Sequence, residues 1–435
     1  MKRSSRWIAV LFALTACNGT RTGNPTVPDK PGAPEGITLL KSSLSRQPGM
    51  LDSANPAFAR DTQDFAFDLY GEVAGDGTEN LFFSPYSISV ALAMTYAGAR
   101  AETERQIAEA LHFTLPQAEL HGSFNAVDLM LESRGEPVEI EGETFDGLQL
   151  STINASFTER TLNVEEPFLD ILALSYGAGV YLTDFRGNPE ESRANINDWV
   201  LEQTEDRIVD LLPDGSITVD TVMVLVNAIY FKANWREAFQ AKDTADGVFH
   251  APSADVTVPL MHAEQHRMYA EGDGYQAIEL PYIPTTVKML FVLPEEGRFA
   301  EVEGRLGSSF LADLLARREE RNAKITLPRF SFSYELQLKE TLEALGMPIP
   351  FECGDADFTG ITTAVPICIA DVYHQAFVGL DEKGTEAASA TAVVLVGESA
   401  GPAPATITLD RPFLFLIYDE STGQILFLGR VVDPS

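Results

Sequence analysis

The sequence predicts an α+β fold with large mixed or antiparallel β-sheets, and three observations support this prediction. Patterns typical of helices come early in the chain, and patterns typical of strands come late. No linker is visible after residue 57, which favours one large domain over residues 57–435. Of the 435 residues, 45% are hydrophobic and 22% are charged, so the apolar side chains suffice for one large core or two ordinary ones.

The N-terminus is typical of an export signal. Three basic residues precede an apolar run over residues 7–14, which is too short to cross a bilayer as a mature helix. The run ends in a Leu-Thr-Ala-Cys stretch that resembles the bacterial lipobox, whose Cys is acylated and becomes the new N-terminus. We therefore expect a lipoprotein signal peptide over residues 1–17, with lipid on Cys17 anchoring the protein to the bacterial envelope, the outer membrane being favoured. A plain secretory signal, which would leave the protein extracellular, is the alternative.

Residues 18–56 form a polar stretch punctuated by proline and glycine, with few residues that could build a core. Such a segment buries too little apolar surface to offset the entropy lost on ordering. We expect a flexible tether that holds the folded domain off the membrane.

Helical periodicity marks the early part of the domain. Apolar residues at helical spacing predict helices over residues 65–73, 87–98, 101–111 and 195–210. Strand patterns follow, rich in β-branched and aromatic residues. They predict strands over residues 221–235, 286–293, 325–333, 413–418 and 424–432. The last two flank a polar turn at residues 419–423, which indicates a hairpin.

Charge excludes one class of function. The chain has 64 acidic and 31 basic side chains, for a formal net charge of −33. A surface this negative repels phosphate backbones, so nucleic acid is not expected as a partner.

Cys353 and Cys368 are the two cysteines outside the signal. An exported protein meets an oxidising compartment, where two remaining thiols usually pair, so we expect a disulfide. Two buried free thiols are the alternative.

The segment from Gly384 to Arg411 is much longer than an ordinary connection between strands. Its first part consists of small residues and then becomes β-branched. Taken alone, this composition favours a helix capped by Thr385, followed by a flexible loop. The functional interpretation is a bait loop that converts into a strand, because small side chains can enter between existing strands.

A resemblance decides between these interpretations. The Glu-Lys-Gly-Thr-Glu-Ala-Ala stretch at residues 382–388 is similar to the hinge of an inhibitory serpin. Nine further motifs resemble that family in family order, at residues 80–87, 195–200, 225–235, 280–282, 293–294, 327–330, 357–361, 411–413 and 429–434. The resemblance implies the serpin fold, with an exposed reactive-centre loop at about residues 382–405.

The resemblance also implies a mechanism and assigns site residues. A serine or cysteine endopeptidase would cleave the loop, form an acyl-enzyme, and be trapped when the loop enters the central sheet of this metastable fold. The hinge would comprise Glu382, Gly384, Thr385, Glu386, Ala387, Ala388, Ser389 and Ala390. The shutter, where the sheet opens, would comprise Ser84, Ser87, Asn227 and His374. The breach, where insertion begins, would comprise Trp235, Arg329 and Glu382.

The family's usual spacing from the hinge places the cleaved bond at Glu398-Ser399. A glutamate there suits a protease with a basic specificity pocket. Cleavage after Leu395 or Val396 would instead suit elastase-like or subtilisin-like enzymes. The expected partner is the target protease, and the protein is expected to act as a monomer without a cofactor or metal and not as an enzyme.

Two other functions compete with this one. A serpin-fold protein that binds or assists folding without inhibiting would be indicated by a charged or proline-containing hinge, and Thr385 and the alanine-rich run that follows argue against it. A hydrolase or metalloenzyme is disfavoured because its usual motifs are missing from the sequence. His262, Glu264 and His266 could share a helix face, but their surroundings predict strand, where that spacing does not converge on a metal.

Overall fold

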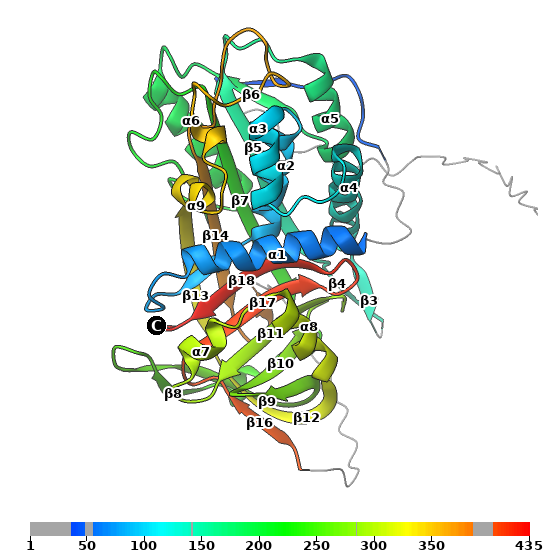
Figure 1. The fold of residues 1–435 in the computed structure, drawn as a ribbon. Helices are drawn as coiled ribbons and strands as arrows, with labels where there is room; N and C mark the ends of the chain where they lie inside the picture. The colour runs from blue at the N-terminus through cyan, green and yellow to red at the C-terminus, as the bar shows by residue number, and fades with distance from the viewer. Residues whose placement is uncertain (1–35, 48–54, 141, 284, 386–402) are drawn as a thin grey trace, which may run out of the picture.

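The computed structural model describes residues 36–47, 55–140, 142–283, 285–385 and 403–435. These residues build two large β-sheets surrounded by helices, as Figure 1 shows. We call the seven-stranded sheet of the described residues sheet A and the nine-stranded sheet sheet B. The α+β class with large mixed β-sheets expected from the sequence is confirmed.

Sheet A supplies the candidate site. Its strand order is β1 (Thr38–Leu40), β6 (Val180–Thr183), β5 (Gln149–Glu159), β7 (Met223–Asn234), β15 (Gly384–Thr385), β14 (Val372–Leu380) and β13 (Phe330–Gln337). Strands β7 and β14 are long, parallel and buried on both faces, which explains their nearly continuous apolar sequences.

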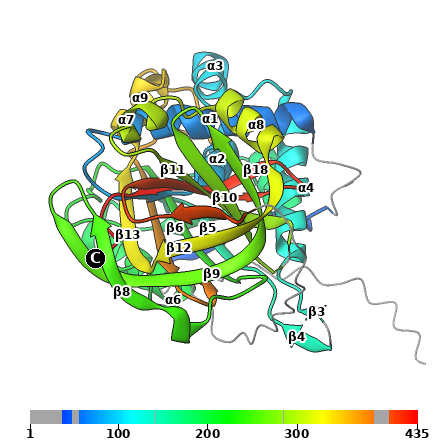
Figure 2. The same ribbon diagram turned by 90° about the horizontal axis from the view of Figure 1, so that it is seen from below.

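Sheet B lies at the lower end of the molecule in Figure 1, and Figure 2 shows that end from below. Its strand order is β16 (Ala405–Thr408), β12 (Glu319–Pro328), β9 (Asp255–Gly272), β10 (Tyr275–Pro281), β11 (Val287–Pro294), β17 (Phe413–Asp419), β18 (Gln424–Val431) and β2 (Leu81–Phe83). Strand β8 (Ala245–His250) pairs with β9, and β3 (Val138–Ile140) pairs with β4 (Glu143–Phe145) as a separate hairpin.

The helices of the described residues lie around the sheets. They are α1 (Pro56–Val73), α2 (Pro85–Tyr96), α3 (Ala101–Ala110), α4 (Gln117–Ser133), α5 (Glu166–Tyr176), α6 (Pro189–Gln203), α7 (Phe299–Glu303), α8 (Ser308–Arg317) and α9 (Lys339–Ala344), with 3-10 turns at Ala241–Asp243 and Ile349–Phe351. Among the described residues, no helix combines the length and apolar character that crossing a bilayer requires.

Helix α2 is buried along its whole length, between β5 and β7 of sheet A and β18 of sheet B. Its sequence is apolar or small on every side, as expected for a helix inside a core. Ser84 caps it by accepting a hydrogen bond from the backbone N–H of Ser87, and Pro85 occupies the first turn, where no N–H is needed.

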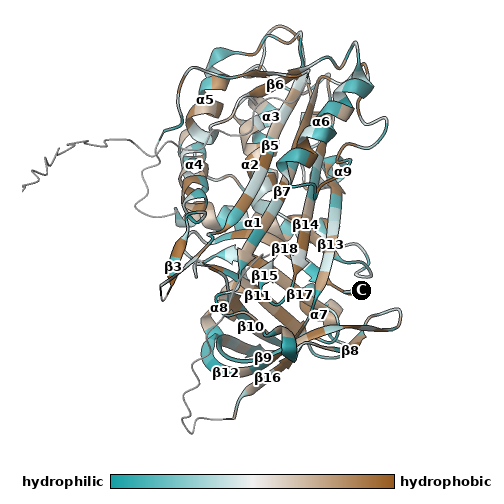
Figure 3. Ribbon diagram, turned by 180° about the vertical axis from the view of Figure 1, so that it is seen from behind, coloured by the Kyte–Doolittle hydropathy of each residue, from teal (hydrophilic) through white to brown (hydrophobic). Residues whose placement is uncertain are grey.

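Helix α6 covers the opposite face of sheet A, as Figure 3 shows from behind. Its Trp199 side chain packs edge-on against Phe157 of β5, with ring centroids 5.8 Å apart, and against Tyr181 of β6 at 5.2 Å. These contacts form a second apolar cluster, separate from the main core around α2.

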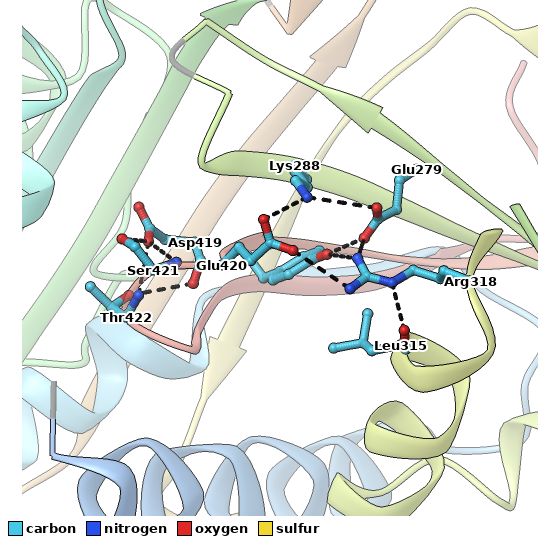
Figure 4. Close-up of polar contacts among 9 residues, drawn as sticks. Glu279, Lys288, Leu315, Arg318, Asp419, Glu420, Ser421 and Thr422 are labelled. Atoms are coloured by element: carbon cyan, nitrogen blue, oxygen red, sulfur yellow. Dashed lines mark hydrogen bonds and ion pairs between the residues drawn. The ribbon is translucent and has the colours of Figure 1, made fainter. Parts of the chain in front are cut away.

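A buried ion-pair cluster ties the strands of sheet B together (Figure 4). The Glu279 carboxylate, 2% exposed, accepts hydrogen bonds from Arg318 and from the Tyr418 hydroxyl. Lys288 lies 3.8 Å from the same carboxylate and 2.7 Å from Glu420. Burial, followed by the Glu279 charge, raises the pKa of Tyr418, so this hydroxyl stays protonated and donates.

The β17–β18 hairpin expected from the sequence is confirmed. In its turn the buried Asp419 carboxylate accepts hydrogen bonds from the backbone N–H groups of Ser421 and Thr422, at 2.8 and 3.0 Å (Figure 4). An aspartate that bonds its own backbone in this way fixes a tight turn.

The strand predicted over residues 325–333 is wrong in extent. Pro328 ends β12 in sheet B, and Phe330 begins β13 in sheet A. Arg329 still donates its N–H to the Pro259 carbonyl of β9 at 3.0 Å, and the next residue, Phe330, pairs with Leu380 of β14. The single apolar run therefore divides between two sheets.

The helix predicted over residues 195–210 also differs from the structure. Helix α6 begins six residues earlier at Pro189, a favourable first position, and ends at Gln203. Glu205, Asp206 and Asp210 have positive φ angles, which a continuing helix does not permit.

Residues 36–47 depart from the tether that the sequence predicts over residues 18–56. Within them β1 adds a strand to the edge of sheet A, and Ile37 is buried in the α6 cluster. Composition alone hides this segment, because a single short apolar run interrupts an otherwise polar stretch.

Candidate functional site

The chain leaves β14 through a tight turn and immediately re-enters sheet A as β15. The Asp381 carboxylate accepts hydrogen bonds from the backbone N–H groups of Lys383 and Gly384, at 2.8 and 3.3 Å. Gly384 has a φ of +152°, and a Cβ atom there would lie 2.0 Å from the Ala233 carbonyl oxygen. Only glycine fits this position, so the Gly at the start of the expected hinge has a steric cause.

Strand β15 occupies one end of a gap between β7 and β14. Gly384 pairs with Asn234 of β7, and Thr385 pairs with Ala233 of β7 and Leu380 of β14, antiparallel to both strands. Further along, β7 and β14 pair directly with each other through residues 225–230 and 372–377. Sheet A is therefore open at the end where the hinge enters and closed beyond it.

Thr385 is held inside this opening by an aromatic pair. Its hydroxyl lies 2.7 Å from the hydroxyl of Tyr282, which is fully buried, and burial raises the pKa of Tyr282. Trp235 stacks on Tyr282 with ring centroids 4.3 Å apart and an interplanar angle of 12°. The Trp235 indole N–H also donates to the Asp381 carbonyl at 3.1 Å, so Trp235 supports the turn before the hinge.

Glu382 and Arg329 form an ion pair at the same end of the sheet. The Glu382 side chain is 8% exposed and also accepts a 2.5 Å hydrogen bond from the Thr244 hydroxyl. Burial would raise the pKa of Glu382, but hydrogen bonds from Arg329 and Thr244 outweigh it and lower the pKa below its usual value. The carboxylate is thus ionised at neutral pH and ties the turn to sheet B.

The four residues expected at the shutter come together from α2, β7 and β14, and each has a fully buried side chain. His374 accepts at Nε2 from the Ser84 backbone N–H at 3.1 Å, and its Nδ1 contacts the Asn227 side-chain oxygen. The Asn227 amide donates to the Ser87 hydroxyl at 2.5 Å. Burial lowers the pKa of His374 to about 3, so the ring is neutral, and these partners assign its proton to Nδ1.

Other residues of the site were not expected from the sequence. Tyr282 and Thr244 contact the hinge turn, and Asn154 of β5 lies beside Asn227. Tyr282 belongs to the motif at residues 280–282, but nothing in that motif indicates that Tyr282 contacts Thr385. Asn154 is a polar residue in a strand pattern, a weak signal of a buried hydrogen bond.

The structure joins Cys353 to Cys368 in a disulfide with the two Cα atoms 4.6 Å apart. His262 and His266 lie on strand β9, where side chains four residues apart point the same way but are separated by about 13 Å. Among the described residues, no group of three or more His, Cys, Asp or Glu side chains could hold a metal ion.

Several expected site residues lie outside the described residues. They are Cys17, the hinge residues Glu386, Ala387, Ala388, Ser389 and Ala390, and the reactive-bond residues Leu395, Val396, Glu398 and Ser399.

Comparison with known proteins gives consistent matches. A sequence model of the serpin (serine protease inhibitor) family matches residues 60–434. A serpin-like protein of Thermococcus kodakarensis is 40% identical over 372 residues, covering 85% of this chain and 84% of that protein. Alpha-1-antiproteinase of Rattus norvegicus is 35% identical, covering 86% of this chain and 88% of that protein. The crystal structure of tengpin, a thermophilic serpin in the native state, has a TM-score of 0.81 and 27% identity, covering 91% of this chain and 99% of that one.

The match to the family model spans residues 60–434, from the first turns of α1 to the end of the domain. Serpins are mostly protease inhibitors rather than enzymes, although members that do not inhibit exist. The chain belongs to the serpin family.

Proposed function

We propose that this serpin is a suicide-substrate inhibitor of serine, and also cysteine, endopeptidases. The observation that carries the proposal is the position of β15, which lies antiparallel to β7 and β14 at the open end of sheet A. A strand that has already started between two others can lengthen by displacing their direct pairing. Loop cleavage would release the chain to do so, and the acyl-bound protease would move with it.

The register of β15 supports complete insertion. Continued in that register, each further loop residue would pair one position earlier on β7 and on β14. Both pairings then bring residue 391, a threonine, opposite Asn227 of β7 and His374 of β14. Asn227 and His374 are partners of each other in the closed sheet. The registers on β7 and on β14 therefore both place residue 391 at the centre of the shutter.

Side-chain size fits the same register. Thr385 faces the main core, so alternate loop residues would face the α6 side instead. They are Glu386, opposite Lys232 at the entrance, then Ala388, Ala390 and Ala392, and Val394 at the far end. That face of β7 packs tightly through Val224, Val226 and Ala228 against α6. Alanine is the smallest side chain that keeps a normal strand backbone, so the alanine positions favour entry.

The same register bears on the cleaved bond. Residue 395 would lie opposite Met223, the first residue of β7, so insertion would end there. Cleavage at the proposed Glu398-Ser399 bond would leave residues 396–398 as a short link to the trapped enzyme. Cleavage after Leu395 or Val396 would leave almost no link, which makes Glu398 the better candidate.

The test is incubation of the purified protein with a panel of serine proteases, including a glutamyl endopeptidase, followed by boiling in detergent. We expect a covalent adduct and a released C-terminal peptide that begins at Ser399 by mass spectrometry. The matched control is Thr385→Arg, because an arginine cannot enter the buried site beside Tyr282. This variant should be cut without forming an adduct.

Two outcomes would overturn the proposal. An adduct formed equally well by Thr385→Arg would show that trapping does not need insertion. Failure of the unaltered protein to form any adduct, with no rise in melting temperature after cleavage, would favour a binding or folding-assisting serpin of the envelope.

The proposed location follows from the sequence alone. Acylation of Cys17 would anchor the monomer to the bacterial envelope, with the outer membrane as the favoured site. Incorporation of a labelled fatty acid into the protein, and its loss in Cys17→Ser, would support this. A Cys17→Ser protein that stays in the membrane fraction would contradict it.

A further inference from the structure

The N-terminal segment is fastened to the domain along residues 36–47, which we call the strap. At its start, Thr38, Leu39 and Leu40 pair antiparallel with Leu182, Tyr181 and Val180 of β6. A Cβ atom on Gly36 would lie 3.1 Å from the Asn195 amide nitrogen on α6, so the strap begins in contact with α6.

The strap is fastened a second time at its end. The Arg46 side chain, 6% exposed, donates to Asn125 at 2.8 Å, Asp128 at 2.6 Å and Glu132 at 2.7 Å, all on α4. Gln47 donates its backbone N–H to the Leu174 carbonyl of α5 at 3.0 Å. A buried arginine with three partners is costly to release, because its partners would be left unpaired.

The strap fixes where the preceding chain leaves the domain. Strand β6 pairs with residues 156–159 of β5, and the same end of β5 pairs with the Met223 end of β7. The hinge enters at Asn234, the other end of β7. The strap and the hinge are therefore separated by the length of a 12-residue strand, about 40 Å. Figure 1 shows the strap in blue at the top and β16, where the reactive loop returns, at the bottom.

We propose that the strap orients the protein on the surface that holds its N-terminus, a lipid bilayer, with the α6 and β6 end toward the bilayer and the reactive loop away from it. This proposal rests on the proposed function for the identity of the loop and the anchor. Without the strap, the N-terminal segment would leave the domain at Asn55, at the start of α1. It would then leave in a different direction and would not set the same orientation.

The length of the tether supports the orientation. Residues 18–35 separate the expected lipid on Cys17 from the strap. A tether as flexible as this composition predicts would reach roughly 25 Å on average and roughly 60 Å when fully extended. If the loop faced the bilayer, the strap would lie farther from the bilayer by about the length of β7. That distance is well beyond the average reach of the tether. Most attached molecules should therefore present the loop outward.

The test couples the protein to phosphatidylcholine vesicles that carry maleimide headgroups, which removes any dependence on natural lipidation. Cys17 is the one thiol outside the disulfide, so residues 17–435 attach through it. The matched control carries Cys17→Ser and a cysteine added after Ser435. Ser435 lines the same groove as Arg329 and Leu380, so this attachment directs the hinge end toward the bilayer.

The readout is the rate at which subtilisin, coupled to micrometre beads, cuts the loop. Every cut chain is counted, whether released or held as an adduct, so the result does not depend on inhibition. We expect the N-terminally attached protein to be cut within about twofold of the unattached protein, and the C-terminally attached protein roughly fivefold more slowly. Equal rates for the two attachments would overturn the proposal.

A second pair of variants tests the strap itself. Residues 37–47 are replaced by a Gly-Ser sequence of equal length, and in a matched control residues 20–30 are replaced in the same way. In the protein attached through Cys17, replacing residues 37–47 should lower the rate of loop cutting toward the rate seen with C-terminal attachment. Replacing residues 20–30 should leave the rate of loop cutting unchanged. Identical rates in both replacements, with unchanged loop cutting in solution, would show that the strap does not set the orientation.

Discussion

Thr391→Val offers the sharpest test of loop insertion, because its effect should depend on whether the loop has entered sheet A. In the intact protein the His374 Nδ1 and the Asn227 side-chain oxygen already have a hydrogen-bond partner, because they bind each other. Insertion separates β7 from β14 by one further strand spacing, about 4.8 Å, so this bond must break. In the register of β15, the Thr391 hydroxyl would lie between them, able to accept from His374 Nδ1 and donate to the Asn227 oxygen.

The magnitude follows from those two groups. Valine has the shape of threonine without the hydroxyl, so it would leave one buried donor and one buried acceptor unpaired. Each costs about 1–3 kcal/mol, so the cleaved form should lose about 2–6 kcal/mol of unfolding free energy. The intact form should change by no more than about 0.5 kcal/mol, because its described shutter side chains already pair with one another.

The assay is guanidinium unfolding of the intact and cleaved forms, followed by tryptophan fluorescence, with Thr391→Ser as the control that keeps the hydroxyl. The serine variant should resemble the unaltered protein more closely than valine does in the cleaved form. An equal loss in the intact and cleaved forms of Thr391→Val, or no loss in either, would refute the reasoning from register.

Three further predictions concern stability. The lowered pKa of Glu382 means that its ion pair stabilises the folded state above the ordinary value of 4.5 and less as pH falls below it. Glu382→Gln should therefore lower the melting temperature at pH 7, and a gap that persisted at pH 3 would contradict this. His374, with its pKa lowered to about 3 from 6.5, should cost stability as pH falls between these values, by about 1.4 kcal/mol per pH unit, and His374→Gln should flatten that slope in thermal unfolding. Replacing Cys353 and Cys368 by serine should cost about 3 kcal/mol in urea unfolding, and reductant should reproduce the loss in the unaltered protein only.

The sequence predicted the parts of the fold in which local pattern and tertiary role agree. The long run that became β7 is apolar because both faces of sheet A are covered, and β17 and β18 flank a turn with its own hydrogen bonds. The hinge turn was predictable as a motif, and the structure adds the reason, which is the space that only Gly384 can occupy.

The remaining features depend on contacts between distant parts of the chain. The strap is a polar segment that gains its structure from the free edge of β6 and from carboxylates on α4, which no local pattern reveals. The change of sheet after Arg329 likewise depends on distant partners, because β12 pairs with β9 and β13 pairs with β14. Asn154 meets Asn227 only because β5 and β7 are paired in one register.

The strap attaches the N-terminal segment to the end of sheet A where Met223 begins β7. This position has a mechanical consequence for a captured enzyme. For a protein anchored through Cys17 as proposed, full insertion would carry the acyl group to that end, and the captive would arrive between the protein and the bilayer. A protease of ordinary size is about 40 Å across, which is more than the roughly 25 Å average reach expected of a flexible 18-residue tether. Capture would therefore stretch the connecting chain, and its length would limit how large an enzyme the anchored protein can hold.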